Sequence, residues 1–203
     1  MKNYDKLVDT QNIAWYDICR WALQENFPKK ISASGNRYHF EDDWEFYDTL
    51  ITSFEYDNKM ITWESKSCNA MPYYGRGRGA SIHGTNGTVI IDRNGYEMFD
   101  LDGKKTFEFE KPVKDETTGL VGGGPLTNAH FQNFIDAIKG KSNLNSSLDK
   151  VNTSCDILLI ANIAWKEGKV LNIDTNTGQI IDNQSAIDKY WAREYEPGWE
   201  PKI

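Results

Sequence analysis

The chain is poor in cysteine and histidine, carries no excess of positive charge and contains no long apolar run. Its 203 residues include 3 cysteines and 3 histidines, and its formal net charge is −7. An acidic chain lacks the basic surface that binds nucleic acid or anionic membranes. No stretch approaches the roughly 18 apolar residues of a membrane-spanning helix. We therefore expect neither a nucleic-acid partner nor a membrane.

The three cysteines, Cys19, Cys68 and Cys155, are widely spaced and odd in number. Reduced thiols in a cytoplasmic protein explain this better than a disulfide framework. The histidines share no ligand-type spacing with these cysteines, so we expect no metal site.

The composition is that of a globular protein, with 39% hydrophobic and 13% aromatic residues. The length predicts a single domain over residues 1–203, with a leader at 1–11 and a C-terminal extension at 181–203. Seven tryptophans are more than a small core needs. Two interpretations stay open for them: some lie at an interface or a sugar-binding edge, or they cover a sheet internally.

Short strand-like runs follow one another through the first half of the chain. Between residues 80 and 110 they are separated by Asn86-Gly87, Asn94-Gly95 and Asp102-Gly103. These pairs tolerate the positive φ angles of tight hairpin turns, so they predict an antiparallel meander. A weaker strand at 30–40 and a hairpin formed by 49–56 and 60–67 precede it.

Helix-like periodicity occupies the first residues and the second half. We expect helices at 13–26, from Thr127 or Asn128 to Gly140, at 148–167 and around 184–192, and a short strand at 170–173. The second helix has an apolar stripe made by Phe131, Phe134, Ile135 and Ile138. The predicted class is α+β, with a large, mainly antiparallel, open-faced sheet and helices packed on one face.

Two glycine-rich segments resemble phosphate-binding loops only superficially. Gly75-Arg76-Gly77-Arg78-Gly79 lacks the strand-loop-helix context and the lysine of such loops, so a flexible cationic loop is favoured. Gly122-Gly123-Gly124 precedes a helix and could present N–H groups to an anion, but a hinge is the simpler interpretation. Asp17 and Arg20 stand three residues apart, which fits a surface ion pair or a carboxylate at a cleft edge.

The order of motifs resembles the C-terminal domain of the glucose–fructose oxidoreductase, inositol dehydrogenase and rhizopine-catabolism (Gfo/Idh/MocA) family. Six segments carry the likeness: YDICRWAL (16–23), ITWESKSCN (61–69), GRGRGASIHGTNGTVIID (75–92), HFQNFIDAIKGK (130–141), ANIAWKEGKVLNID (161–174) and AREYEPGW (192–199).

The resemblance implies an open-faced sheet that builds a substrate pocket and pairs subunits. In that family a preceding Rossmann domain binds NAD or NADP, and the substrates are sugars, cyclitols or their derivatives. This chain has no G-x-G-x-x-G fingerprint, so we expect no cofactor site within it and NAD or NADP only in a full-length relative.

Two departures from the family concern catalysis. The family histidine three residues before the aspartate that matches Asp17 is Ala14 here, and the aspartate four residues earlier still is Thr10. Glu110-Lys111-Pro112 repeats the letters of the family's lysine motif but lies after the meander, outside that motif's place. Alanine cannot transfer a proton, so the resemblance gives no catalytic residue.

The leading hypothesis is a substrate-binding and oligomerisation domain of an NAD(P)-dependent sugar or cyclitol oxidoreductase, truncated and inactive alone. The alternative is a free-standing dimerisation or protein-interaction module without catalysis. Whether the chain is an enzyme stays open. The expected partners are a second copy of the chain, through the open sheet face, and a sugar-like small molecule. The candidate substrate-binding residues are Asp17, Arg20, Arg76 and Arg78.

Overall fold

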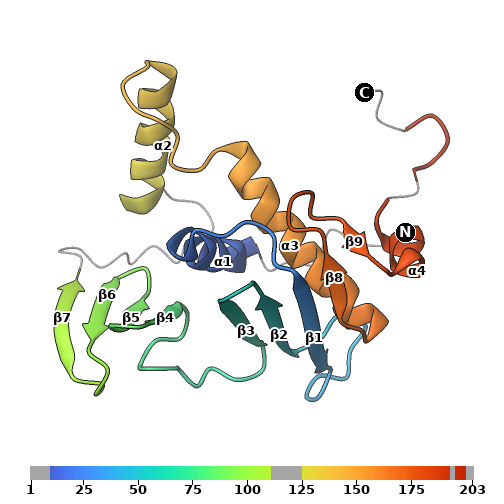
Figure 1. Cartoon of the computed structure of the whole chain (residues 1–203), viewed down its shortest axis with the longest axis horizontal. Helices are drawn as coiled ribbons and strands as arrows, with labels where there is room; N and C mark the ends of the chain where they lie inside the picture. Colours follow the sequence, from blue (N-terminus) through green and yellow to red (C-terminus); the bar gives the residue numbers. More distant parts are fainter. Residues whose placement is uncertain (1–9, 111–124, 193–194, 200–203) are drawn as a thin grey trace. The chain divides into compact units, whose positions relative to one another are not determined.

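The computed structural model describes residues 10–110, 125–192 and 195–199, which form four helices and nine strands (Figure 1). The helices are α1 (Thr10–Leu23), α2 (Pro125–Ile138), α3 (Leu148–Glu167) and α4 (Gln184–Tyr190). The strands are β1 (Lys30–Asn36), β2 (Thr49–Glu55), β3 (Met60–Lys66), β4 (Ala80–Gly84), β5 (Gly87–Ile91), β6 (Gly95–Phe99), β7 (Lys105–Glu110), β8 (Leu171–Ile173) and β9 (Ile180–Ile181).

The strands form two sheets, in the orders β3-β2-β1-β8-β9 and β4-β5-β6-β7, and every pairing within them is antiparallel. The predicted α+β class with antiparallel sheets is confirmed. The strands divide into two sheets because the segment between β3 and β4 holds only an isolated bridge, between Tyr73 and Arg76. The chain correspondingly separates into two compact units, one of Met1–Asn69 with Asn152–Ile203 and one of Ala70–Val151.

In the first unit, α1 and α3 cover one face of the five-stranded sheet (Figure 1). Alternation along β2 buries Leu50, Thr52 and Phe54, as a strand with one covered face requires. Phe54 contacts Tyr16 of α1, with ring centroids 4.7 Å apart. The core therefore joins the first helix to strands and to a helix far along the chain.

The buried side of α1 includes polar as well as apolar side chains. Tyr16 and Arg20 are buried, whereas Ile18 is only partly covered. Polar side chains can be buried when their polar atoms find partners. The Tyr16 hydroxyl meets the Tyr56 hydroxyl at 3.0 Å, and burial raises the pKa of Tyr16 well above its usual value.

The opposite face of the five-stranded sheet carries no helix among the described residues of this unit. Its central cross-strand row is made of hydroxyl side chains, Ser32, Ser53 and Thr62, with Ser32 and Ser53 oxygens 2.7 Å apart. Two apolar side chains, Ile51 and Met60, are more than half exposed on this face. The face is thus open, as expected.

The second unit contains the predicted meander. Strands β4 to β7 pair in sequence order, and Gly87 and Gly95 at two of the turns have positive φ angles. A side chain at Gly87 would place its Cβ 2.1 Å from the Phe99 carbonyl oxygen, so glycine is required there for space as well.

Helix α2 begins at Pro125, earlier than expected, since proline suits the first helical position. Its apolar stripe is exposed in the described structure, from Ile135 at 41% to Ile138 at 70%. Residues 1–9 and the Gly122–Gly124 segment lie outside the described residues. No helix in the described part of the chain is long and apolar enough to cross a membrane.

Candidate functional site

Asp17 and Arg20, on α1, are brought together with a residue that sequence reasoning missed, Ser154 of α3. The Ser154 hydroxyl donates to Asp17 Oδ1 at 2.7 Å, and Arg20 Nη2 reaches the same oxygen at 3.1 Å. Arg20 Nε donates to Ser154 Oγ at 3.0 Å. The three side chains close a ring of polar contacts between two helices.

The Arg20 guanidinium forms its hydrogen bonds with groups of the protein itself. Its Nη1 atom donates to the Glu25 carbonyl at 3.1 Å and to Asn26 Oδ1 at 3.3 Å, where the chain leaves α1. The residue is 6% exposed. Among the described contacts Arg20 therefore acts as a positioning residue for Asp17 and for the end of α1.

The two carboxylate oxygens of Asp17 differ in their contacts. Oδ1 accepts both hydrogen bonds, whereas Oδ2 has no partner within the part of the chain that the structure describes. The side chain is 33% exposed. A carboxylate fixed in this way can accept a hydrogen bond from a hydroxyl group that approaches α1.

The rest of α1 offers little acid–base chemistry. Ala14 is exposed one turn before Asp17. Burial raises the pKa of the Cys19 thiol to about 11, so this thiol stays protonated and is a poor nucleophile at neutral pH. The described part of α1 thus offers no histidine beside Asp17.

Arg76, in the second unit, is paired with two carboxylates of the meander. Its guanidinium contacts Asp92 at 2.7 Å and Glu97 at 2.8 Å, and Lys105 contacts Glu97 at 2.6 Å. Hydrogen bonds from Lys105 and Arg76 lower the pKa of Glu97. Arg76 therefore joins the glycine loop to β5 and β6, while Arg78 is exposed beyond it.

Backbone groups at Tyr73 and Arg76, in and next to the glycine loop, bond to each other. The Tyr73 N–H donates to the Arg76 carbonyl at 3.1 Å, and the Arg76 N–H donates back to the Tyr73 carbonyl at 2.8 Å. A phosphate-binding loop needs converging N–H groups that are free to donate. This turn supports the interpretation of the segment as a structural loop.

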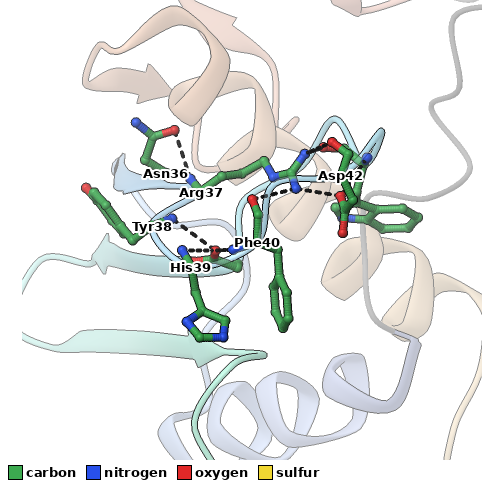
Figure 2. A network of polar contacts seen from close by, with 8 residues as sticks. Asn36, Arg37, Tyr38, His39, Phe40 and Asp42 are labelled. Atoms are coloured by element: carbon green, nitrogen blue, oxygen red, sulfur yellow. Dashed lines mark hydrogen bonds and ion pairs between the residues drawn. The ribbon is translucent and has the colours of Figure 1, made fainter.

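The loop between β1 and β2 is held by a network of polar contacts (Figure 2). The Asp48 carboxylate accepts from the backbone N–H groups of Tyr38, His39 and Phe40 at 2.9, 2.8 and 3.2 Å. Burial by itself raises the pKa of Asp48, but these hydrogen bonds and one from Thr49 outweigh it and bring the pKa to about 2.

Arg37 braces the same loop from inside. Its guanidinium donates to the carbonyl oxygens of Phe40, Asp42 and Trp44 (Figure 2). Tyr38 is left 72% exposed. The strand predicted at 30–40 ends at Asn36, and the hydrogen bonds of this loop were not predicted because neither Asp48 nor Arg37 stands in a recognisable motif.

The His83 side chain makes local contacts. The His83 ring lies between the hydroxyls of Ser81, at 3.2 Å, and Thr88, at 3.0 Å, on the β4–β5 hairpin. No group of three or more potential metal ligands occurs in the described part of the chain.

Comparison with known proteins identifies similar structures but no matching family model. No family model and no curated protein matches the chain. Three solved structures are similar to it. They are an oxidoreductase-type protein from Thermotoga maritima (18% identity, TM-score 0.58), an oxidoreductase from Agrobacterium radiobacter in complex with NAD+, L-tartaric acid and magnesium (14%, 0.59), and the WlbA dehydrogenase from Chromobacterium violaceum in complex with NADH and UDP-GlcNAcA (12%, 0.51).

The match covers 80%, 79% and 83% of this chain, but only 45%, 47% and 46% of those chains. The chain has the fold of part of an oxidoreductase. The resemblance drawn from the sequence motifs is confirmed at the level of fold, and the matched part of the chain spans less than half the length of these proteins.

Proposed function

We propose that this chain is the substrate-binding and oligomerisation domain of an NAD(P)-dependent oxidoreductase that acts on a sugar or cyclitol, and that it is inactive alone. The observation that carries the proposal is the coverage of the structural matches. Most of this chain aligns with less than half of each oxidoreductase. A domain of that kind contributes one side of an active site.

Asp17 supports the substrate-binding role. Its free Oδ2 atom is oriented by two hydrogen bonds on Oδ1, which suits the recognition of a hydroxyl group. A sugar or cyclitol offers several such groups. Arg20 and Ser154 then act through Asp17 by holding its carboxylate.

The described residues do not fit a dinucleotide. All their strand pairings are antiparallel, whereas the dinucleotide fold places its glycine-rich turn in a parallel strand-helix-strand unit. We therefore propose that NAD or NADP binds to a part of the oxidoreductase other than the described residues of this chain. No step of hydride transfer is assigned to this chain.

The open face of the five-stranded sheet supports the oligomerisation role. Its mixture of hydroxyl side chains with the exposed Ile51 and Met60 suits a second sheet or subunit rather than water alone. A copy of the chain would pair this face with itself around a two-fold axis.

Sedimentation of the purified chain tests the oligomerisation. We expect a dimer or larger species at tens of micromolar, and a monomer after Ile51→Asp. Leu101→Asp, which puts the same charge on an exposed apolar site in the β6–β7 turn, serves as the control and should leave association unchanged. A monomeric wild-type chain would overturn this part of the proposal.

Ligand-observed NMR tests the substrate role with myo-inositol and glucose as probes. We expect weak binding that Asp17→Asn removes and that Asp57→Asn, at a turn in the same unit, preserves. NADH should not bind the chain alone. Self-association without binding of either probe would favour the alternative, a dimerisation module, and tight NADH binding would contradict both.

A further inference from the structure

A cavity of about 360 Å³ lies between α3 and the C-terminal segment of the first unit. One wall is α3, from Asp156 to Lys166, and the others are Phe27, the β8–β9 turn and the end of α4 at Trp191. The volume lies at the lower end of the range of small-molecule sites. Neither Asp17 nor the open sheet face contributes to its lining.

The cavity contains a carboxylate without a partner. Asp156 is an exposed residue of α3 at this cavity, and it has no hydrogen bond or ion pair with any described residue. Desolvation by burial raises the pKa of its carboxyl group. A cation that pairs with this carboxylate would stabilise its charged form.

Lys166 also lines this cavity, but it lies too far along α3 to form an ion pair with Asp156. Lys166 follows Asp156 by ten residues, which is about 15 Å along a helix axis and well beyond the roughly 8 Å over which salt screens exposed charges. Its Nζ atom instead lies over the rings of Phe46, at 5.1 Å, and Tyr190, at 5.9 Å.

Phe27, Leu159, Ile163 and Trp191 are among the apolar and aromatic side chains of the lining, to which Asn162 and Thr177 add polar groups. Phe27 is held in place, because its ring lies so close to Gly178 that a Cβ atom there would be 2.5 Å from it. Gly178 also has a φ angle of +75°, which a larger residue rarely adopts. Trp191 is 45% exposed and presents an aromatic surface of the kind that attracts cations.

We propose that this cavity binds a small organic ammonium compound, with the ammonium group paired to Asp156 and an apolar body against Leu159, Ile163 and Trp191. The carboxylate has no counter-charge among the described residues, and Trp191 offers the hydrocarbon body an aromatic surface. The apolar residues of α3 give the site room for a hydrocarbon body. The site is independent of the proposed function of the Asp17 cluster.

The probe is 2-phenylethylammonium, compared with 2-phenylethanol, which has nearly the same shape and no charge. Calorimetry on the full chain should show the amine binding at least about fivefold more tightly than the alcohol. Asp156→Asn should lower the affinity for the amine to that for the alcohol. Trp191→Leu should weaken both probes.

Asp57→Asn is the matched control, because it removes the same charge from a side chain that is 96% exposed in the β2–β3 turn. It should leave amine binding unchanged, which separates the site from the general attraction of an acidic protein for cations. Thermal unfolding of each variant establishes that it is folded.

Three results would overturn the proposal. They are equal affinity for amine and alcohol, amine binding that survives Asp156→Asn in a folded variant, and a preference for 3-phenylpropionate, which would place an anion at Lys166 instead. If the wild-type chain bound the amine but not myo-inositol, that result would count against the proposed function and not against the amine site.

Discussion

The Nε atom of Arg20 lies 3.0 Å from the Oγ atom of Ser154, and this hydrogen bond joins two helices whose contacting residues are 134 positions apart. Ser154 is completely buried, so its hydroxyl has no water to replace these partners. The bond holds Arg20 while the same hydroxyl donates to Asp17. The packing of α1 on α3 and the orientation of the candidate substrate carboxylate thus depend on one serine.

Ser154→Ala should destabilise the first unit by about 1–3 kcal/mol, because it leaves the buried Nε of Arg20 without its partner and removes one of the two hydrogen bonds to Asp17 Oδ1. Urea unfolding monitored by circular dichroism measures this loss. Ser185→Ala is the control, since Ser185 is exposed on α4 and should change stability by less than about 0.5 kcal/mol. Equal stability of the two variants would show that the polar ring contributes nothing.

Local signals predicted elements better than they predicted the partners of side chains. The hairpin turns at Asn86-Gly87 and Asn94-Gly95 were readable because a two-residue turn needs positive φ, and the helix ending at Gly168 was readable for the same reason. The β9 strand was missed, since a strand of two residues leaves no periodicity. The polar ring was also missed, because Ser154 is distant in sequence and serine in a helix carries no signal of its partner.

Gly35→Ala should destabilise the five-stranded sheet by about 1–3 kcal/mol, as over-packing in a tightly packed region does. A Cβ atom at this position would lie 2.3 Å from the Thr49 carbonyl oxygen and 2.8 Å from Leu50 Cα, and the backbone cannot yield as a side chain would. Thermal unfolding measures the effect. Gly77→Ala should be neutral in the same assay, because nothing lies within 4 Å of the added atom.

Arg76→Gln should weaken the meander, because it leaves Asp92 and Glu97 close together without the guanidinium between them. A loss of about 1–3 kcal/mol is expected for charged hydrogen bonds that are mostly shielded from water. Arg93→Gln, on an exposed turn residue, changes the same charge and should have little effect. A result in which only sugar binding changed, with stability intact, would restore Arg76 as a substrate-binding residue.

The four candidate site residues show what kind of inference the sequence allowed. The spacing of Asp17 and Arg20 correctly indicated an ion pair, which the structure shows at 3.1 Å. It could not indicate that Arg20 is buried, because burial depends on α3. Arg76 and Arg78 alternate with glycines and looked equivalent, yet Arg76 is partly buried between the Asp92 and Glu97 carboxylates, whereas Arg78 is exposed. Their roles toward a substrate stay predictions.

Asp48 makes the stability of the β1–β2 loop depend on pH. The pKa of this carboxyl group is about 2 in the folded chain, where the ordinary value is about 3.9. A lowered pKa means that the unfolded state takes up the proton first as pH falls. The contribution of the carboxylate to stability is therefore complete above about pH 5 and is lost progressively as the pH approaches 2.

Asp48→Asn should lower the melting temperature by several degrees at about pH 6, because a neutral amide accepts hydrogen bonds from three backbone N–H groups less strongly than a carboxylate does. The gap between variant and wild type should narrow as pH falls from about 5 toward 2, and Asp57→Asn should show no such narrowing. A gap that stayed constant with pH would mean that the loop is held by Arg37 and not by the charge of Asp48.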